Sequence, residues 1–171
     1  TKSFNAFSSI DYPETAMFRD RRLIQFLQRP AEYTHAVFST ALDPNVFVLR
    51  LVPGMRADII PMLEGRYRAL VLESFGVGGL PGGDDGAMFA AVRDWCGAGH
   101  LAVFTTQVPH EGSDLAVYEV GRAAKALPGV LEAHDMTPEA TAVKLMWVLG
   151  QTIDRAEAEK LFLTPVQWDI L

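Results

Sequence analysis

Residues 69–83 read ALVLESFGVGGLPGG, an apolar run that ends in a glycine-rich turn. The run at residues 69–75 predicts a β-strand, which the glycines stop. Near-continuous apolar strands are typical of parallel sheets that are covered on both faces. Glycines allow positive φ angles and a close approach of the backbone to a ligand. This stretch therefore predicts a buried parallel strand that leads into a candidate ligand-binding loop.

The same rhythm of apolar runs and helical patterns continues on both sides of this stretch. Further strands are expected at residues 45–52, 101–106 and 130–133. Helical patterns fill the segments between and after them, at residues 57–64, 87–96, 114–126 and 138–149 and beyond Asp154. This alternation predicts right-handed βαβ units in a three-layer, flavodoxin-like α/β domain. We expect a mainly parallel sheet of about four strands, with helices on both faces.

The first 44 residues lack this alternation. We interpret residues 1–44 as a connecting arm with one or two extended pieces, and residues 45–171 as the α/β domain. The helix at residues 138–149 has clear end signals, because Thr137 is a good N-cap residue and Pro138 suits the first helical position. Asp154 and Glu157 resemble a capping box that starts a last helix.

Composition excludes several classes of function. The chain has 171 residues, a net charge of −6 and no basic cluster, which argues against nucleic-acid binding. No apolar run approaches the roughly 20 residues that span a bilayer. The single cysteine, Cys96, cannot form an internal disulfide, which is compatible with the cytoplasm, and its position on an apolar helix face indicates a core residue.

Ligands of parallel sheets meet the loops at the carboxyl ends of the strands. The loop that begins at Gly76 starts like a dinucleotide fingerprint, but Pro81 stands where the third glycine should be. A flexible turn is the alternative interpretation of this loop. The four histidines are scattered without metal-ligand spacing. Glu119 lies in an expected helix, where a solvated surface residue is the alternative to a functional one.

Several sequence blocks carry a resemblance to one enzyme family, and they cover nearly the whole chain in order. They are TKSFNAFSSI with Tyr12-Pro13, LVPGM at 51–55, ESFGVGGLP at 73–81, TTQ at 105–107, YEVG at 118–121, and DMTPEA at 135–140 with KLMW at 144–147. Together they resemble the C-terminal domain of bacterial type I, cytoplasmic-type L-asparaginases. The resemblance implies an amidohydrolase that converts L-asparagine to aspartate and ammonia in the cytoplasm, with no metal or organic cofactor.

The same resemblance implies where the chemistry lies. The catalytic threonines belong to Thr-Gly-Gly-Thr and Gly-Thr-Asp-Thr motifs, and this chain contains neither. We therefore expect no catalytic residue in this chain, an N-terminal domain that is missing from it, and no activity of the chain alone. The family's second domain completes the substrate pocket of a neighbouring subunit in a homodimer or homotetramer.

In this resemblance the substrate-binding residues contributed by this chain are Gly78, Gly79 and Glu119. Many members have an asparagine at the position of Gly79, so a backbone contact is expected there. Glu119 would hold the α-ammonium group of the substrate. Glu73 stands where one regulated member has arginine, so allosteric control is not carried over.

Two alternatives stay open. The chain also resembles the asparaginase-like subunit of glutamyl-tRNA amidotransferase, against which its acidic net charge of −6 argues. A non-catalytic ligand-binding or regulatory domain is the second alternative.

Overall fold

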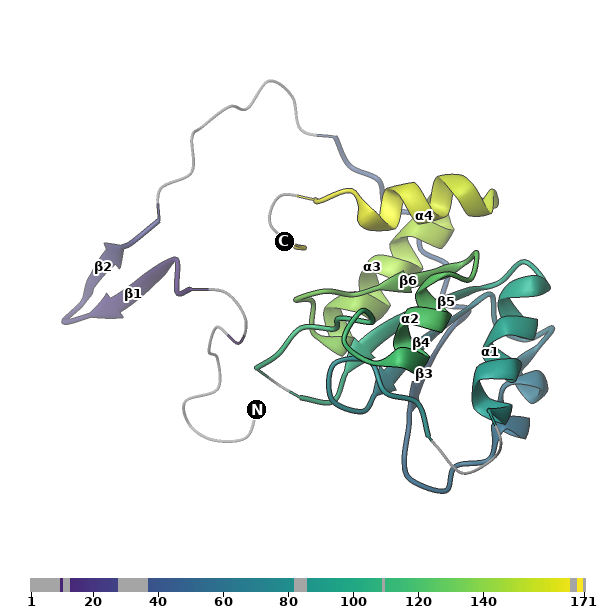
Figure 1. Cartoon of the computed structure of the whole chain (residues 1–171). Coiled ribbons are helices and arrows are strands. Elements are labelled where there is room, and N and C mark those ends of the chain that lie inside the picture. Colours follow the sequence, from purple (N-terminus) through teal and green to yellow (C-terminus); the bar gives the residue numbers. More distant parts are fainter. Residues whose placement is uncertain are drawn as a thin grey trace. The chain divides into compact units, whose positions relative to one another are not determined.

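The computed structural model of the chain describes residue 10 and residues 13–27, 37–81, 86–108, 110–166 and 169–170. The chain divides into two compact units, Thr1–Ser39 and Thr40–Leu171. The first unit contains a small hairpin, and the second contains an α/β sheet with its helices (Figure 1). The second unit begins shortly before residue 45, where the α/β domain was expected to start.

The described part of the first unit is a two-stranded antiparallel hairpin of β1 (Ala16–Arg19) and β2 (Arg22–Gln25). The two turn residues, Asp20 and Arg21, have φ angles of 50° and 63°. Positive φ at both central residues is typical of a type I′ turn, whose twist matches that of the flanking strands.

Both faces of this hairpin are apolar. Met17 pairs with Ile24, and Phe18 pairs with Leu23. Because successive side chains of a strand point to opposite faces, one pair lies on each face. All four side chains are exposed, so the first unit has no apolar core of its own in its described part.

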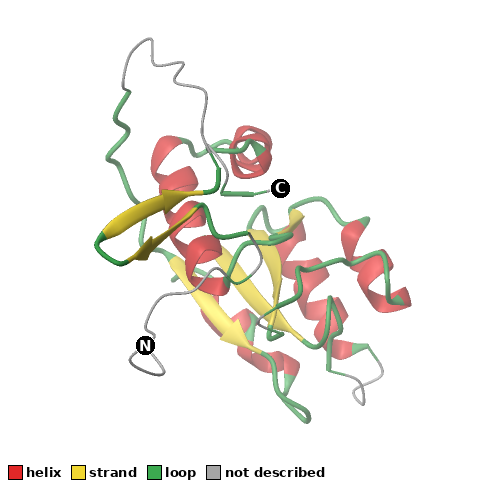
Figure 2. Cartoon of the chain, turned by 90° about the vertical axis from the view of Figure 1, so that its left-hand side faces the viewer, coloured by secondary structure: helices red, strands yellow, loops and turns green. Residues whose placement is uncertain are grey.

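The second unit is built on a sheet of four parallel strands, β3 (Val46–Arg50), β4 (Ala69–Ser74), β5 (Leu101–Thr106) and β6 (Val130–Glu132). Their order in the sheet is β3-β4-β5-β6, which is also their order along the chain. The arrows of this sheet point the same way in Figure 2. The expected parallel sheet of about four strands is confirmed.

The strand order explains which helices share a face. The connections between neighbouring strands contain η1 (Ala57–Ile59) with η2 (Pro61–Leu63), α1 (Ala87–Gly97) and α2 (Glu119–Lys125). Each connection leads one strand further in the same direction across the sheet. Right-handed crossovers in one direction place all their helices on one face of a sheet.

The opposite face is covered by the last two helices, α3 (Pro138–Gln151) and α4 (Arg155–Leu163). Figure 1 shows them on the side of the sheet away from α1. The three-layer arrangement with helices on both faces is therefore confirmed.

Two apolar clusters fill the spaces between these layers. The cluster under α3 and α4 includes Val46, Val71, Val103, Leu131, Leu145, Val148 and Phe162. The cluster under the connecting helices includes Leu49, Leu70, Leu72, Val92, Trp95, Phe104 and Leu115. Alternate residues of β4 and β5 enter opposite clusters, as the two-residue period of a strand requires.

The end signals of the last two helices act as expected. The Thr137 hydroxyl accepts a hydrogen bond from the Ala140 amide at 3.3 Å. The Asp154 carboxylate accepts one from the Glu157 amide at 2.8 Å. Each cap satisfies an amide that has no partner within its own helix.

The prediction of a helix at residues 57–64 is wrong, because the structure has two short 3-10 turns there, η1 and η2. Ile60 donates to the Ala57 carbonyl at 3.1 Å, and Leu63 donates to the Ile60 carbonyl at 3.0 Å. Pro61 has no amide hydrogen, so a continuous helical ladder cannot pass through it.

Candidate functional site

All four parallel strands end at the same edge of the sheet, which we call the carboxyl edge. The loops at this edge begin at residues 51, 75, 107 and 133. Open α/β sheets commonly bind ligands in a crevice at the point where the strand order reverses. The four described strands contain no such reversal. The carboxyl edge of this sheet therefore presents loops but not the crevice that a reversal of strand order makes.

The glycine loop, residues 75–79, follows β4 at this edge and is tightly hydrogen-bonded. The Phe75 amide donates to the Gly79 carbonyl at 3.0 Å. The Phe75 carbonyl accepts from the Gly79 amide at 2.7 Å and from the Gly78 amide at 3.1 Å. Gly76 has a φ of 50°, in the left-handed region that favours glycine. The loop is thus an ordered turn in the described structure.

The glycine loop packs against the 113–118 segment, which leads into α2. The Asp114 amide donates to the Val77 carbonyl at 2.7 Å. A Cβ placed on Gly78 would lie 2.8 Å from Leu115 Cδ2 and 3.3 Å from Leu115 Cα. A Cβ placed on Gly79 would lie 3.2 Å from the Phe75 carbonyl oxygen. The close packing therefore favours glycine at both predicted substrate-binding positions.

The helix predicted at residues 114–126 was too long, because α2 begins only at Glu119 and the 113–118 segment before it is not helical. The Ser113 amide donates to the His134 carbonyl at 2.7 Å, and the Leu115 amide donates to Glu132 Oε2 at 2.8 Å. The Asp114 carboxylate accepts from the Ala116 amide at 2.9 Å. Such side-chain bonds to the local backbone compete with helix formation.

Glu119 is consequently the first residue of α2, with an exposed side chain. Its neighbour Tyr118 reaches the glycine loop, since a Cβ on Gly76 would lie 3.0 Å from the Tyr118 hydroxyl. Among the described residues, none forms a hydrogen bond or ion pair with the Glu119 carboxylate. The structure thus brings the glycine loop and the start of α2 together, and the substrate-binding roles of Gly78, Gly79 and Glu119 stay predictions.

Glu132, at the end of β6, was not singled out by the sequence. Its carboxylate is buried, lies 2.5 Å from Lys125 Nζ of α2, and accepts the bond from Leu115 described above. The hydrogen bond to Glu132 raises the pKa of Lys125 above its ordinary value. Glu132 therefore joins β6, α2 and the 113–118 segment. A lone carboxylate at a strand end gives no sequence signal for such a role.

Gln107 is a second residue whose role appears only in three dimensions. Its side-chain amide donates to the Leu51 carbonyl at 2.7 Å and to the Glu73 carbonyl at 2.8 Å. It thereby joins the carboxyl ends of β3, β4 and β5. Next to it, the Thr106 hydroxyl donates to the Gly76 carbonyl. The carboxyl edge is therefore held by side chains that belong to the TTQ block.

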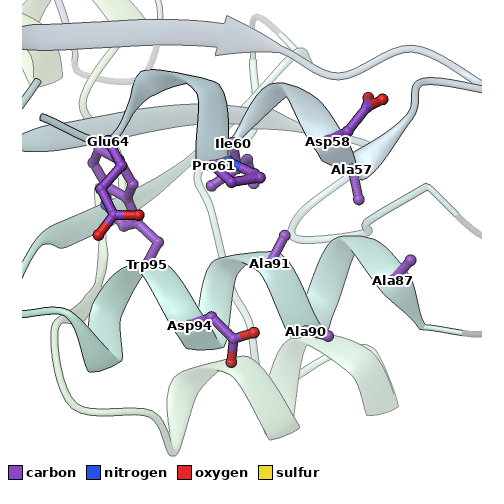
Figure 3. A pocket seen from close by; sticks show the side chains of 10 residues that line it. All are labelled: Ala57, Asp58, Ile60, Pro61, Glu64, Ala87, Ala90, Ala91, Asp94 and Trp95. Atoms are coloured by element: carbon purple, nitrogen blue, oxygen red, sulfur yellow. The ribbon is translucent and has the colours of Figure 1, made fainter. Parts of the chain in front are cut away.

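A separate hollow of about 350 Å³ lies between η1, η2 and α1 (Figure 3). Alanines and three carboxylates make up most of its lining, which consists of Ala57, Asp58, Ile60, Pro61, Glu64, Ala87, Ala90, Ala91, Asp94 and Trp95. Arg56 lies 2.6 Å from Asp58 and lowers the pKa of that carboxyl through a hydrogen bond. The Trp95 indole donates to the Leu101 carbonyl at 2.9 Å. The predicted residues Gly78, Gly79 and Glu119 do not line this hollow.

The described residues include no group of three metal-ligating side chains. In the same part of the chain, every helix is too short or too polar to cross a membrane. Cys96 is buried in α1, where burial raises the pKa of its thiol to about 12. A thiol held in the protonated form is a poor nucleophile.

Comparison with known proteins decides the family. A family model described as the glutaminase/asparaginase C-terminal domain matches residues 45–162. The chain belongs to this family. Within the glutaminase/asparaginase family, it is 39% identical over 158 residues to an L-asparaginase from Thermococcus kodakarensis. That match covers 92% of this chain and 47% of the relative.

Solved structures agree with this assignment. The structure of the thermostable L-asparaginase from Thermococcus kodakarensis superposes with a TM-score of 0.90 at 35% identity, and covers 99% of this chain and 51% of that one. L-asparaginase I from Vibrio cholerae has the same fold, with a TM-score of 0.82 at 23% identity over 97% of this chain and 50% of that one. The chain therefore spans about half the length of these L-asparaginases.

Amidotransferase proteins are also among the relatives. The chain is 32% identical over 170 residues to a glutamyl-tRNA(Gln) amidotransferase subunit from Metallosphaera sedula. That match covers 96% of this chain and 37% of the relative. The resemblance to the C-terminal domain of the glutaminase/asparaginase family is confirmed, and the assignment to bacterial type I enzymes stays a prediction.

Proposed function

We propose that this chain is the C-terminal part of an L-asparaginase of the type I, cytoplasmic kind. The observation that carries the proposal is the 39% identity to an L-asparaginase over 92% of the chain. Several blocks behind this resemblance lie at the carboxyl edge, where the glycine loop and the start of α2 pack together. In this proposal the whole protein hydrolyses L-asparagine to aspartate and ammonia without a metal or organic cofactor.

The carboxyl edge supplies binding groups rather than the nucleophile. Glu119 lies at the start of α2 with an exposed carboxylate, which suits a charge-assisted hydrogen bond to the α-ammonium group of the substrate. The Gly78 and Gly79 amides and the Gly79 carbonyl bond within the glycine loop, so the backbone group that these two glycines offer to the ligand is the Gly78 carbonyl. The attacking threonine hydroxyl and the groups that activate it would come from the missing N-terminal domain.

We further propose that the pocket is completed across a subunit interface in a homodimer or homotetramer. The described sheet has no crevice made by a reversal of strand order, so its carboxyl edge needs a facing surface. Three apolar side chains around Glu119 are exposed, namely Val117, Tyr118 and Val120. Apolar side chains that cluster at the surface are typical of protein–protein interfaces.

The first test uses the gene product that carries this sequence, expressed from its natural start. We expect it to release ammonia from L-asparagine in an assay coupled to glutamate dehydrogenase. A folded protein without such release would contradict the proposal.

One relative favours a second candidate, an amidotransferase subunit, because the identity of 32% to the Metallosphaera sedula protein extends over 96% of the chain. The discriminating measurement is ammonia release from L-glutamine with and without a partner amidotransferase subunit and charged tRNA. Release from glutamine only in their presence would favour the second candidate. Release from asparagine without them favours the L-asparaginase.

The chain of 171 residues by itself is expected to be inactive, because it contains neither threonine motif of the family. Binding groups without a nucleophile leave acyl transfer without its covalent route. Purified chain should release no more ammonia from asparagine than a control without protein. Turnover that survives additional purification would mean that the catalytic group lies in this chain.

A further inference from the structure

Tyr118 lies at the carboxyl edge, between the glycine loop and Glu119. It is the N-cap residue of α2, and 46% of its surface is exposed. Its ring lies over Gly76, because a Cβ on that glycine would lie 3.0 Å from the Tyr118 hydroxyl oxygen, 3.6 Å from Cε2 and 3.7 Å from Cζ. The tip of the ring therefore covers the start of the glycine loop.

The backbone of Tyr118 takes part in α2. Its carbonyl accepts a hydrogen bond from the Arg122 amide at 2.9 Å, which is the first helical bond of α2. Glu119 is the next residue along the chain. Tyr118 thus contacts the glycine loop with its ring and fixes the start of the helix that carries Glu119 with its backbone.

The hydrogen bonds within the glycine loop fix its internal shape. The Phe75 and Gly79 backbones bond to each other. From outside the loop, the Asp114 amide donates to the Val77 carbonyl at 2.7 Å, and the Thr106 hydroxyl donates to the Gly76 carbonyl. The Tyr118 ring adds a packing contact at Gly76, and close packing of this kind opposes a movement of the loop towards the ring.

We propose that Tyr118 is a positioning residue, whose ring sets the distance between the Gly78-Gly79 backbone and the Glu119 carboxylate in the asparagine site. This inference rests on the proposed function. The hydroxyl of Tyr118 is the atom nearest to the Cβ position of Gly76, but it has no hydrogen-bond partner among the described residues, so the contact is one of packing. A phenylalanine keeps the ring atoms Cε2 and Cζ at 3.6 and 3.7 Å from that position and should therefore keep most of the contact.

The experiment compares Tyr118→Ala, which removes the ring, with Tyr118→Phe, which keeps it. Val143→Ala is the control, because Val143 is also an exposed apolar residue but lies in α3, outside the segments that we place at the subunit interface. In the asparagine-hydrolysing gene product, Tyr118→Ala should raise KM for asparagine by about tenfold with kcat within about twofold. Tyr118→Phe and Val143→Ala should both stay within about twofold of the original KM.

A second readout needs no activity. The amides of Gly78 and Gly79 both donate to the Phe75 carbonyl, so their hydrogen exchange reports on the glycine loop. In the chain of 171 residues, Tyr118→Ala should speed this exchange, while Tyr118→Phe and Val143→Ala leave it unchanged and the melting temperature stays constant.

The outcomes separate this inference from the proposed function. If the gene product releases no ammonia, the proposed function fails, and the exchange data still decide whether Tyr118 holds the loop. Unchanged KM and unchanged exchange in Tyr118→Ala would overturn the inference. So would a Tyr118→Phe variant as impaired as Tyr118→Ala, or faster exchange that is accompanied by a general loss of stability.

Discussion

Cys96 is the only cysteine of the chain, and its side chain packs in the cluster under the connecting helices. Desolvation by burial raises the pKa of its thiol to about 12, from an ordinary value of 9.0. The thiolate is the reactive form of cysteine, and it is nearly absent at pH 8 when the pKa is this high. The structure therefore supports the sequence-based interpretation of Cys96 as a core residue.

We expect the native protein to resist Ellman's reagent at pH 8, because the reagent needs both access and a thiolate. After unfolding in guanidinium chloride, the thiol should react completely. The absorbance of released thionitrobenzoate measures both states, and Cys96→Ser should give no signal in either. Rapid, complete modification of the folded protein would contradict the burial of this side chain.

At the scale of elements, the short helix α2 is held in place by contacts at close range. Gly121 is buried in α2, and a Cβ placed there would lie 2.5 Å from the Leu115 carbonyl oxygen and 3.2 Å from its carbonyl carbon. Both atoms belong to the backbone, so a rotamer change cannot relieve the overlap. The helix therefore needs glycine at this position to approach the 113–118 segment.

Gly121→Ala should lower the free energy of unfolding by about 1–3 kcal/mol, as overpacking of a core commonly does. Gly97→Ala is the matched control, because Gly97 also lies in a helix but has open space around the added Cβ. It should change the free energy of unfolding by less than about 1 kcal/mol, in the stabilising direction. Urea denaturation followed by circular dichroism measures both variants. Equal stability of the two variants would argue against the close packing of α2.

The elements that the sequence predicted well are those with local signals. The runs at 69–74 and 101–106 became β4 and β5 because apolar, β-branched stretches bounded by glycine or polar residues specify buried strands. The helix expected at 114–126 was too long, because the amides of Ser113, Asp114 and Leu115 bond to groups that are distant in the sequence. A local pattern contains no information about such bonds.

The candidate site was predictable to a similar degree. The glycine loop was visible as a motif, and its place at the carboxyl edge followed from the strand before it. The hydrogen bonds from Gln107 to Leu51 and Glu73 depend on the order of three strands in the sheet. The periodicity of apolar residues does not predict that order. The contact of Tyr118 with Gly76 also depends on where the 113–118 segment leaves the helical path.

At the scale of the whole molecule, the hairpin of β1 and β2 exposes apolar side chains on both faces. An isolated two-stranded hairpin is marginally stable in water. Strands that are apolar on both faces are typical of sheets covered on both sides. The hairpin therefore has the character of a piece of a larger sheet, and the chain spans only about half of the L-asparaginases it matches.

We predict that the chain of 171 residues self-associates through this hairpin. Phe18 and Leu23 are 73% and 66% exposed, so a Phe18→Ser, Leu23→Ser variant should lower the mean mass in sedimentation velocity. Ile153→Ser is the control, because Ile153 is 92% exposed but lies in the second unit between α3 and α4. A clean monomer of the unmodified chain at high concentration would count against the prediction.

The agreement between strand order and chain order also bears on how the second unit folds during synthesis. Each strand from β4 to β6 pairs with the strand made just before it, so the sheet can grow as the chain leaves the ribosome. The connecting helices cover one face during this growth. The other face, which presents Val46, Val71, Val103 and Leu131, is covered only when α3 and α4 emerge. A nascent chain that has emerged from the ribosome as far as β6, with α3 and α4 still inside, therefore displays an open apolar sheet, the kind of surface that chaperones bind.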